Sequence, residues 1–98
     1  MPYAIVTFDK PDHGALRASV RERHVAYLEA NVHRLLAAGA MTEDDGTGGS
    51  GGIILVDTDS REEAERFIAD DPFTQAGLFD RVIVKRWRKA FFDGKRVL

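Results

Sequence analysis

The order in which strand-like and helix-like segments follow one another is the strongest constraint on how this chain can fold. The segments expected to form strands are Tyr3–Phe8, Ala40–Asp44, Gly52–Asp57 and Arg81–Trp87, and those expected to form helices are Ala15–Ala38 and Ser60–Asp70. The order is therefore strand, helix, strand, strand, helix, strand, which is the split βαβ, or ferredoxin-like, pattern. We predict an α+β domain in which a four-stranded antiparallel sheet carries both helices on one face.

Local signals define the ends of these segments. No Gly or Pro interrupts residues Ala15–Ala38, and Gly39 follows where a helix C-cap is expected. Ser60–Glu63 fits a capping box, and Pro72 ends or redirects the second helix. The glycine-rich stretch Gly46–Gly52 is interpreted as a hairpin loop, because neither flank is long enough to fold alone.

The length of 98 residues allows one domain, here residues 1–98 with a basic, aromatic tail over about 88–98. A chain of this size has room for one modest core and little room for a deep pocket. With both helices on one side, the other face of the sheet is left bare, and a bare apolar face needs a partner. We therefore expect a homodimer in which two sheets close one α+β barrel.

Composition excludes several classes of protein. Lys plus Arg is 14 and Asp plus Glu is 16, and this net charge of −2 argues against nucleic acid as a partner. Without cysteine there is no disulfide, thiolate nucleophile or Cys-ligated metal. The three histidines do not form a metal-binding pair, and no apolar run is long enough to span a membrane. We expect a cytoplasmic protein that needs no metal or cofactor.

His24 is the most informative single residue. At 100° per residue, His24 falls between Val20 and Leu35 in the apolar stripe of the first predicted helix, and Arg21 lies on the same side. A histidine in that position is either a core histidine satisfied by one hydrogen bond or a general acid or base. The spacing alone leaves both possibilities open.

Asp71 is the second candidate. Asp70 and Asp71 are adjacent carboxylates at the end of a predicted helix, where the helix dipole disfavours anions. Because Asp71 precedes Pro72, its backbone is biased toward an extended conformation. Asp71 then either forms an Asx-type turn that ends the helix, or pairs with His24 and orients its ring.

Several segments, in their order and spacing, resemble the YciI-like (YCII-related domain) family over about Tyr3 to Trp87. The segments are Ser19-Val20-Arg21-Glu22-Arg23-His24, Leu35-Leu36-Ala37-Ala38-Gly39, Ser60-Arg61-Glu62-Glu63-Ala64, Asp71-Pro72-Phe73 and Ala76-Gly77-Leu78. The resemblance implies a dimeric α+β barrel with a His–Asp pair, here His24 and Asp71, and one branch of the family is similar to a dehydrochlorinase.

We therefore expect a small cofactor-independent enzyme that moves protons through His24 in an elimination or isomerisation of a small, aromatic or lactone-like substrate. Arg21 is expected to hold an anionic or phenolate oxygen of that substrate. Ser19 and Phe73, from the same motifs, are the other expected substrate-binding residues. The alternative is a non-catalytic dimeric module that binds a small molecule or a protein, in which His24 is only a hydrogen-bond partner.

Overall fold

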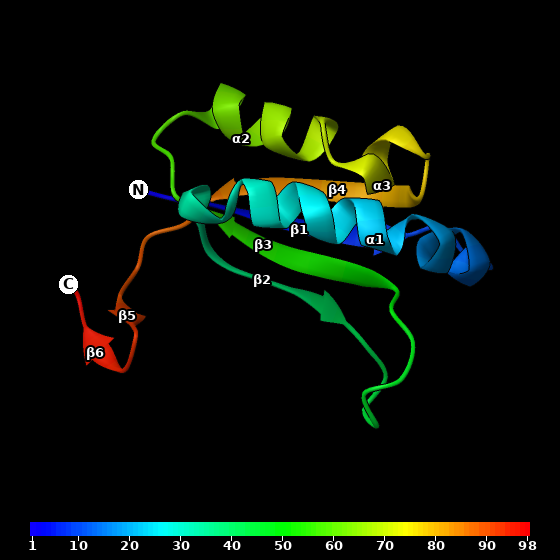
Figure 1. Cartoon of the computed structure of the whole chain (residues 1–98). Coiled ribbons are helices and arrows are strands. Elements are labelled where there is room, and N and C mark those ends of the chain that lie inside the picture. The colour runs from blue at the N-terminus through cyan, green and yellow to red at the C-terminus, as the bar shows by residue number, and fades with distance from the viewer.

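The computed structural model describes residues 1–98 and consists of one main sheet, helices on one side of it and a small C-terminal hairpin (Figure 1). The elements are β1 (Tyr3–Asp9), α1 (Gly14–Ala30), a 3₁₀ turn η1 (Val32–Arg34), β2 (Leu35–Met41), β3 (Gly51–Val56), α2 (Arg61–Ala69), α3 (Pro72–Gln75), β4 (Phe79–Arg86), β5 (Phe91–Phe92) and β6 (Lys95–Arg96). The main sheet is antiparallel throughout and has the order β2-β3-β1-β4. The predicted α+β, ferredoxin-like fold is confirmed.

Alternation along β1 separates a buried face of the sheet from an open one. Tyr3, Ile5 and Thr7 point toward the helices and are buried. In an antiparallel sheet, directly opposed residues share a face, so the partners of Ile5 on the neighbouring strands extend the same layer. The core on this side combines strand residues with two from α2: Ile5, Ile54, Val56, Phe67 and Ile68.

The opposite face of the sheet is apolar at its centre, with Arg81 and Lys85 of β4 toward one edge, and no helix of the chain covers it (Figure 1). Val6 is opposed by Ile53 on one side and Ile83 on the other. Phe8 is 39% exposed and Ile53 is 45% exposed. The bare face predicted from the order of elements is therefore present in the single chain.

The largest departure from the sequence prediction is at the end of α1. The helix was expected to reach Ala38, but it ends at Ala30, and Leu35–Met41 forms β2. Asn31 ends the helix by donating its backbone amide to Leu28 O and its side-chain amide to Tyr27 O. The residues beyond it instead pair with β3, so Gly39 lies within a strand and is not a helix cap.

At the start of α2, one of the two hydrogen bonds of the predicted capping box is present. Ser60 Oγ accepts the Glu63 amide at 3.1 Å, as expected of an N-cap. The Glu63 carboxylate does not return to the Ser60 amide. It accepts from Thr58 Oγ1 at 2.7 Å, and the Ser60 amide donates to the same Thr58 oxygen at 3.1 Å. The Thr58 hydroxyl therefore connects the Glu63 carboxylate to the Ser60 amide.

The glycine-rich segment is the loop between β2 and β3, as predicted, and Gly51 explains part of its composition. A Cβ atom on Gly51 would lie 2.1 Å from the Thr7 carbonyl oxygen and 2.7 Å from Met41 Cε. Only glycine lets the backbones of β3 and β1 approach so closely at this point. The close approach also shapes the cavity beside α1, because Gly51 and Gly52 line it.

No helix of the structure combines the length and the apolar character needed to cross a membrane.

Candidate active site

His24 and Asp71 lie in direct contact. His24 Nδ1 is 2.9 Å from both Oδ1 and Oδ2 of Asp71, although 47 residues separate them in the chain. The Asp71 side chain is completely buried, whereas that of His24 is 17% exposed. The ring of His24 therefore has a hydrogen-bond partner, and that partner is the Asp71 carboxylate. This is the pairing that the sequence suggested as one of two roles for Asp71.

The chain reversal after α2 brings Asp71 to this position. Asp71 is extended (φ −63°, ψ 131°), as expected for a residue before proline, and its Oδ1 accepts the Phe73 amide at 2.8 Å to cap α3. α3 packs against α1, which carries His24. Asp71 therefore forms the local turn and also pairs with His24, so the two proposed roles are compatible.

The hydrogen bond to Asp71 fixes the tautomer of neutral His24. A carboxylate can only accept, so Nδ1 carries the ring proton and Nε2 keeps its lone pair. No hydrogen bond within the chain involves Nε2. The Phe73 ring stacks on the imidazole with centroids 4.0 Å apart and an interplanar angle of 17°, which restricts rotation of the His24 ring. The arrangement leaves one nitrogen of an oriented histidine available to accept a proton.

His24 borders a cavity of about 230 Å³ between α1 and the β2–β3 half of the sheet. An apolar protein cavity of about 150 Å³ accommodates benzene, so this space is sufficient for a substituted single ring. Its lining combines charged, aromatic and small residues, among them Arg17, Arg21, His24, Phe73, Thr7, Gly39, Gly51 and Ile54. The cavity therefore offers a base, a flat apolar wall and positive charge to one small molecule.

Arg17 is a site residue that the sequence analysis missed. Its Nε lies 2.6 Å from Asp9 Oδ2, and the two side chains are only 12% and 6% exposed. Its Nη2 donates to Gly51 O at 3.1 Å, and its guanidinium carbon is 4.7 Å from the centroid of the Phe73 ring. The helical projection did contain a signal, because Arg17 lies only about 20° from His24 around α1.

The other expected substrate-binding residues lie in different surroundings. Arg21 is exposed and lines the cavity, and Phe73 is buried in its wall. Ser19 is exposed, its hydroxyl donates to Leu16 O at 2.9 Å, and it is not among the residues that line the cavity. Arg21 and Phe73 therefore line the cavity, and Ser19 does not.

Tyr27 connects the site helix α1 to α2. Its hydroxyl donates to Phe67 O at 2.7 Å, and its ring lies 5.2 Å from that of Phe67. Burial raises the pKa of Tyr27, and the nearby Asp70 carboxylate raises it further. The hydroxyl therefore stays protonated at neutral pH and serves as a fixed donor between the helices.

Comparison with known proteins places the fold and the site in context. The YCII-related domain matches residues 1–88. Protein YciI of Escherichia coli is 36% identical over 98 aligned positions, which cover 93% of this chain and all of the relative, and an uncharacterised protein of Haemophilus influenzae is 33% identical with the same coverage.

A solved structure of 5-chloro-2-hydroxyhydroquinone dehydrochlorinase from Burkholderia phenoliruptrix, in complex with 2,5-dihydroxybenzoquinone, superposes with a TM-score of 0.83 at 31% identity. The superposition covers 90% of this chain and 94% of that one. Given the domain match, the identity to both bacterial relatives and the shared fold, the chain belongs to the YCII-related domain family.

Proposed function

We propose that this protein is a small cofactor-independent enzyme in which His24 transfers protons as a general base and acid, with Asp71 holding the ring. The observation that carries the proposal is the fully buried Asp71 on Nδ1 of a histidine that borders a cavity and has Nε2 free. A base of this kind contributes about 10²- to 10⁴-fold to the rate of a proton transfer. Asp71 supports it by fixing the tautomer and stabilising the imidazolium that forms.

We propose elimination of hydrogen chloride from a chlorinated, hydroxylated single ring as the reaction class. The elimination proceeds from the keto tautomer of the ring, in which a hydroxyl proton has moved to the carbon that carries chlorine. Nε2 takes a proton from a second hydroxyl, the electron pair of that O–H bond moves into the ring system, and chloride leaves with the electrons of the C–Cl bond. The products are a quinone-type ring, chloride and a proton, so no oxidant or reductant is required. The dehydrochlorinase with this fold acts on such a ring, which supports the choice of substrate class.

The two cavity arginines suit a substrate of this class. Hydroxylated aromatic rings develop negative charge on oxygen as they lose protons, and guanidinium groups stabilise such oxygens. Arg17 is already paired with Asp9, whereas Arg21 has no ion-pair partner in the chain. Arg21 is therefore the residue we expect to contact the anionic oxygen directly.

We further propose that the functional unit is a homodimer in which the bare sheet faces of two chains pack together. Exposed apolar positions on that face, such as Phe8 and Ile53, would then be buried. Sedimentation velocity over a range of concentrations tests this. A species of twice 10.9 kDa supports the dimer, and a monomer at all concentrations contradicts it.

The enzymatic proposal is tested with 5-chloro-2-hydroxyhydroquinone under anaerobic conditions, because hydroquinones oxidise in air. We expect chloride release and quinone absorbance to rise together, with no cofactor added. A non-catalytic binding module would give a different result, in which 2,5-dihydroxybenzoquinone binds equally well to the wild type and to His24→Ala, with no chloride released. That result would overturn the proposal.

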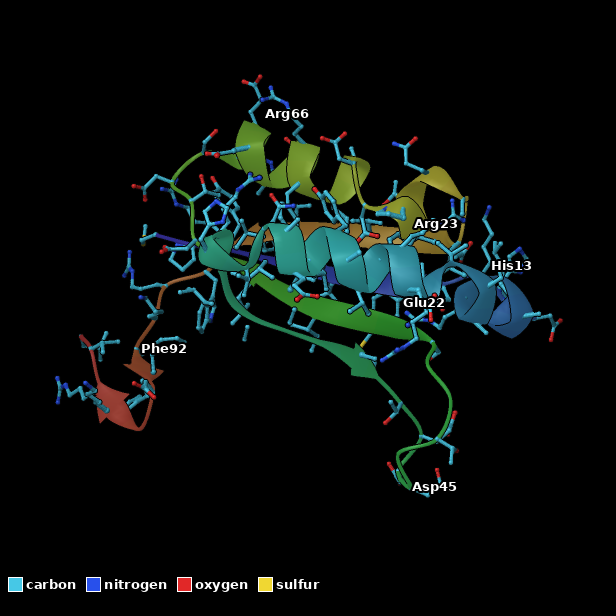
Figure 2. The ribbon with its side chains drawn as sticks, viewed as in Figure 1. His13, Glu22, Arg23, Asp45, Arg66 and Phe92 are labelled. Atoms are coloured by element: carbon cyan, nitrogen blue, oxygen red, sulfur yellow. The ribbon has the colours of Figure 1, made fainter.

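A conservative change at Arg21 tests its contact with the substrate oxygen. We expect Arg21→Gln to lower kcat/KM at least about tenfold, with a fall in kcat as well as a rise in KM, because a charge-assisted contact to an oxygen that becomes anionic in the reaction is lost while the base remains. Steady-state kinetics of chloride release measure both parameters. Arg23→Gln is the matched control, since Arg23 is an exposed arginine two residues further along α1 that does not line the cavity (Figure 2). Equal effects of the two variants would contradict the role of Arg21.

A further inference from the structure

The C-terminal residues form a preorganised β-hairpin. Phe91 pairs with Arg96 and Phe92 with Lys95, and Asp93 and Gly94 both have positive φ values, of 55° and 73°. Two successive residues with positive φ and the sequence Asp-Gly are typical of the tight type I′ turn. The Lys89 ammonium lies 4.9 Å from the centroid of the Phe92 ring, within the hairpin. The segment therefore has its own defined shape.

This hairpin has almost no support from its own chain. No hydrogen bond or ion pair connects residues 88–98 to residues 1–87, and Figure 1 shows the hairpin standing apart from the sheet. Phe91 is 71% exposed and Leu98 is 70% exposed. The radius of gyration is 13.7 Å, against about 12.6 Å expected for a compact chain of this length. Since an isolated two-stranded hairpin is marginally stable in water, these apolar side chains need a surface elsewhere.

A surface of complementary charge lies at the opposite end of the molecule. The loop between β2 and β3 carries Glu43, Asp44 and Asp45, whereas the hairpin segment carries Arg88, Lys89, Lys95 and Arg96 against one acidic side chain, Asp93. Hydrogen bonds from Thr47 lower the pKa of Asp45, so the loop is negative at neutral pH. Figures 1 and 2 show the loop, with Asp45 at its tip, and the hairpin, with Phe92, at opposite ends and on the side of the sheet away from the helices.

We propose that the C-terminal hairpin of one protomer docks on the β2–β3 loop of a second copy of the same chain. The inference rests on the proposed dimer. A twofold axis that lies between two bare sheet faces, perpendicular to the line from loop to hairpin, exchanges the ends of the molecule. In this arrangement it brings the basic hairpin of each chain to the acidic loop of the other. Phe91 and Leu98 then pack against the partner instead of facing water, and each dimer contains two such contacts.

The contact places the hairpin of one chain beside the cavity of the other. The strands that enter and leave the loop line the cavity through Gly39, Ala40, Gly51 and Gly52. A hairpin seated on the loop therefore borders this end of the partner's cavity. It supplies aromatic and basic side chains there, beside Arg17 of α1, which already donates to Gly51 O.

Cross-linking tests the contact directly, and the absence of native cysteine makes introduced thiols unambiguous. Two differently tagged full-length chains, one with Lys95→Cys and one with Asp44→Cys, are co-expressed and treated with a short bismaleimide. We expect a covalent heterodimer. The matched control replaces Asp44→Cys by Arg66→Cys, an exposed site on α2 on the helix side, and we expect no heterodimer there (Figure 2).

Dimer affinity provides a second, independent measurement. We expect Phe91→Ser, and separately Lys95→Glu with Arg96→Glu, to raise the dimer dissociation constant at least about tenfold in sedimentation experiments, since an apolar anchor or the charge match is lost. Glu43→Lys with Asp44→Lys in the partner chain should restore the affinity of the charge-reversed hairpin.

The possible results separate the two proposals. A stable dimer with no cross-link above the control and unchanged affinity in both hairpin variants would overturn the hairpin contact and leave the dimer standing. A wild-type protein that remains monomeric would overturn both. A chain carrying both cysteines that cross-links only within itself would show that the hairpin folds onto its own loop, which also overturns the inference.

Discussion

His24→Gln should lower kcat for chloride release from 5-chloro-2-hydroxyhydroquinone by about 10²- to 10⁴-fold, because it removes the only group in the cavity suited to accept a proton near neutral pH. Glutamine keeps a polar side chain of similar length, but its amide cannot take up a proton. Its packing against Phe73 is also weaker, since the stacked pair at 4.0 Å is lost. The rate is measured by chloride release at saturating substrate, with circular dichroism confirming that the variant is folded.

A second histidine provides the control for this substitution. His33 lies in the 3₁₀ turn after α1, is exposed and does not line the cavity. We expect His33→Gln to retain the wild-type rate. If both variants lose activity equally, or if His24→Gln turns over within about threefold of the wild type, His24 is not the proton-transfer group.

The parts of the fold that the sequence predicted correctly were those decided by local chemistry. A short, mostly apolar, β-prone run identified β1, the Ser60 hydroxyl identified the start of α2, and the extended backbone of Asp71 followed from Pro72. Each of these signals depends on neighbours within a few residues. Because no distant segment competes with them, the strand, the N-cap and the extended residue are all present in the structure.

The end of α1 could not be predicted in this way, because a competing long-range interaction decides it. The apolar run Leu35-Leu36-Ala37-Ala38 is compatible both with a continued helix and with a strand. What selects the strand is the open edge of β3, whose backbone groups pair with residues 35–41. Strand pairing between segments separated by a loop overrides local helix propensity here.

The site itself was only partly visible in the sequence. His24 and Asp71 were identified because each occupies a position that is unfavourable for its side chain. His24 lies in an apolar stripe, and Asp71 lies at the C-terminal end of a helix, where the dipole disfavours anions. Arg17 projects about 20° from His24 around the helix, but an arginine near the start of a helix is ordinary, so the sequence did not single it out. Its role depends on Asp9 and Phe73, which approach it only in the folded chain.

Asp71→Asn should abolish most of the activity without unfolding the protein. Asp71 Oδ1 accepts both the Phe73 amide, at 2.8 Å, and His24 Nδ1, at 2.9 Å. An asparagine oxygen can keep the α3 cap, but its NH₂ group then faces Nδ1 at the place of Oδ2, 2.9 Å away in the wild type. Two donors cannot share that contact, so the His24 ring adopts the tautomer with its proton on Nε2.

In that tautomer Nε2 can no longer accept a proton, and the negative charge that stabilises the imidazolium is also gone. In the serine-protease triad the same substitution costs about 10⁴-fold in kcat, and we expect a loss of about 10³- to 10⁴-fold here. Nitrogen-15 NMR of the imidazole distinguishes the two tautomers directly. Asp70→Asn, at the exposed neighbouring carboxylate, should change neither the tautomer nor the rate.

The rate, the tautomer and the free energy of unfolding of Asp71→Asn together distinguish a capping role for Asp71 from an orienting role. If Asp71 served only to cap α3, Asp71→Asn would retain both the cap and the wild-type rate. Asp71→Ala would then lower the free energy of unfolding by about 1 kcal/mol, with no specific effect on kcat. If Asp71 orients the base, Asp71→Asn loses activity while its free energy of unfolding stays close to that of the wild type, and the NMR spectrum shows the proton on Nε2. The rate and the tautomer must change together, because both depend on the single hydrogen bond between Nδ1 and a carboxylate that cannot donate.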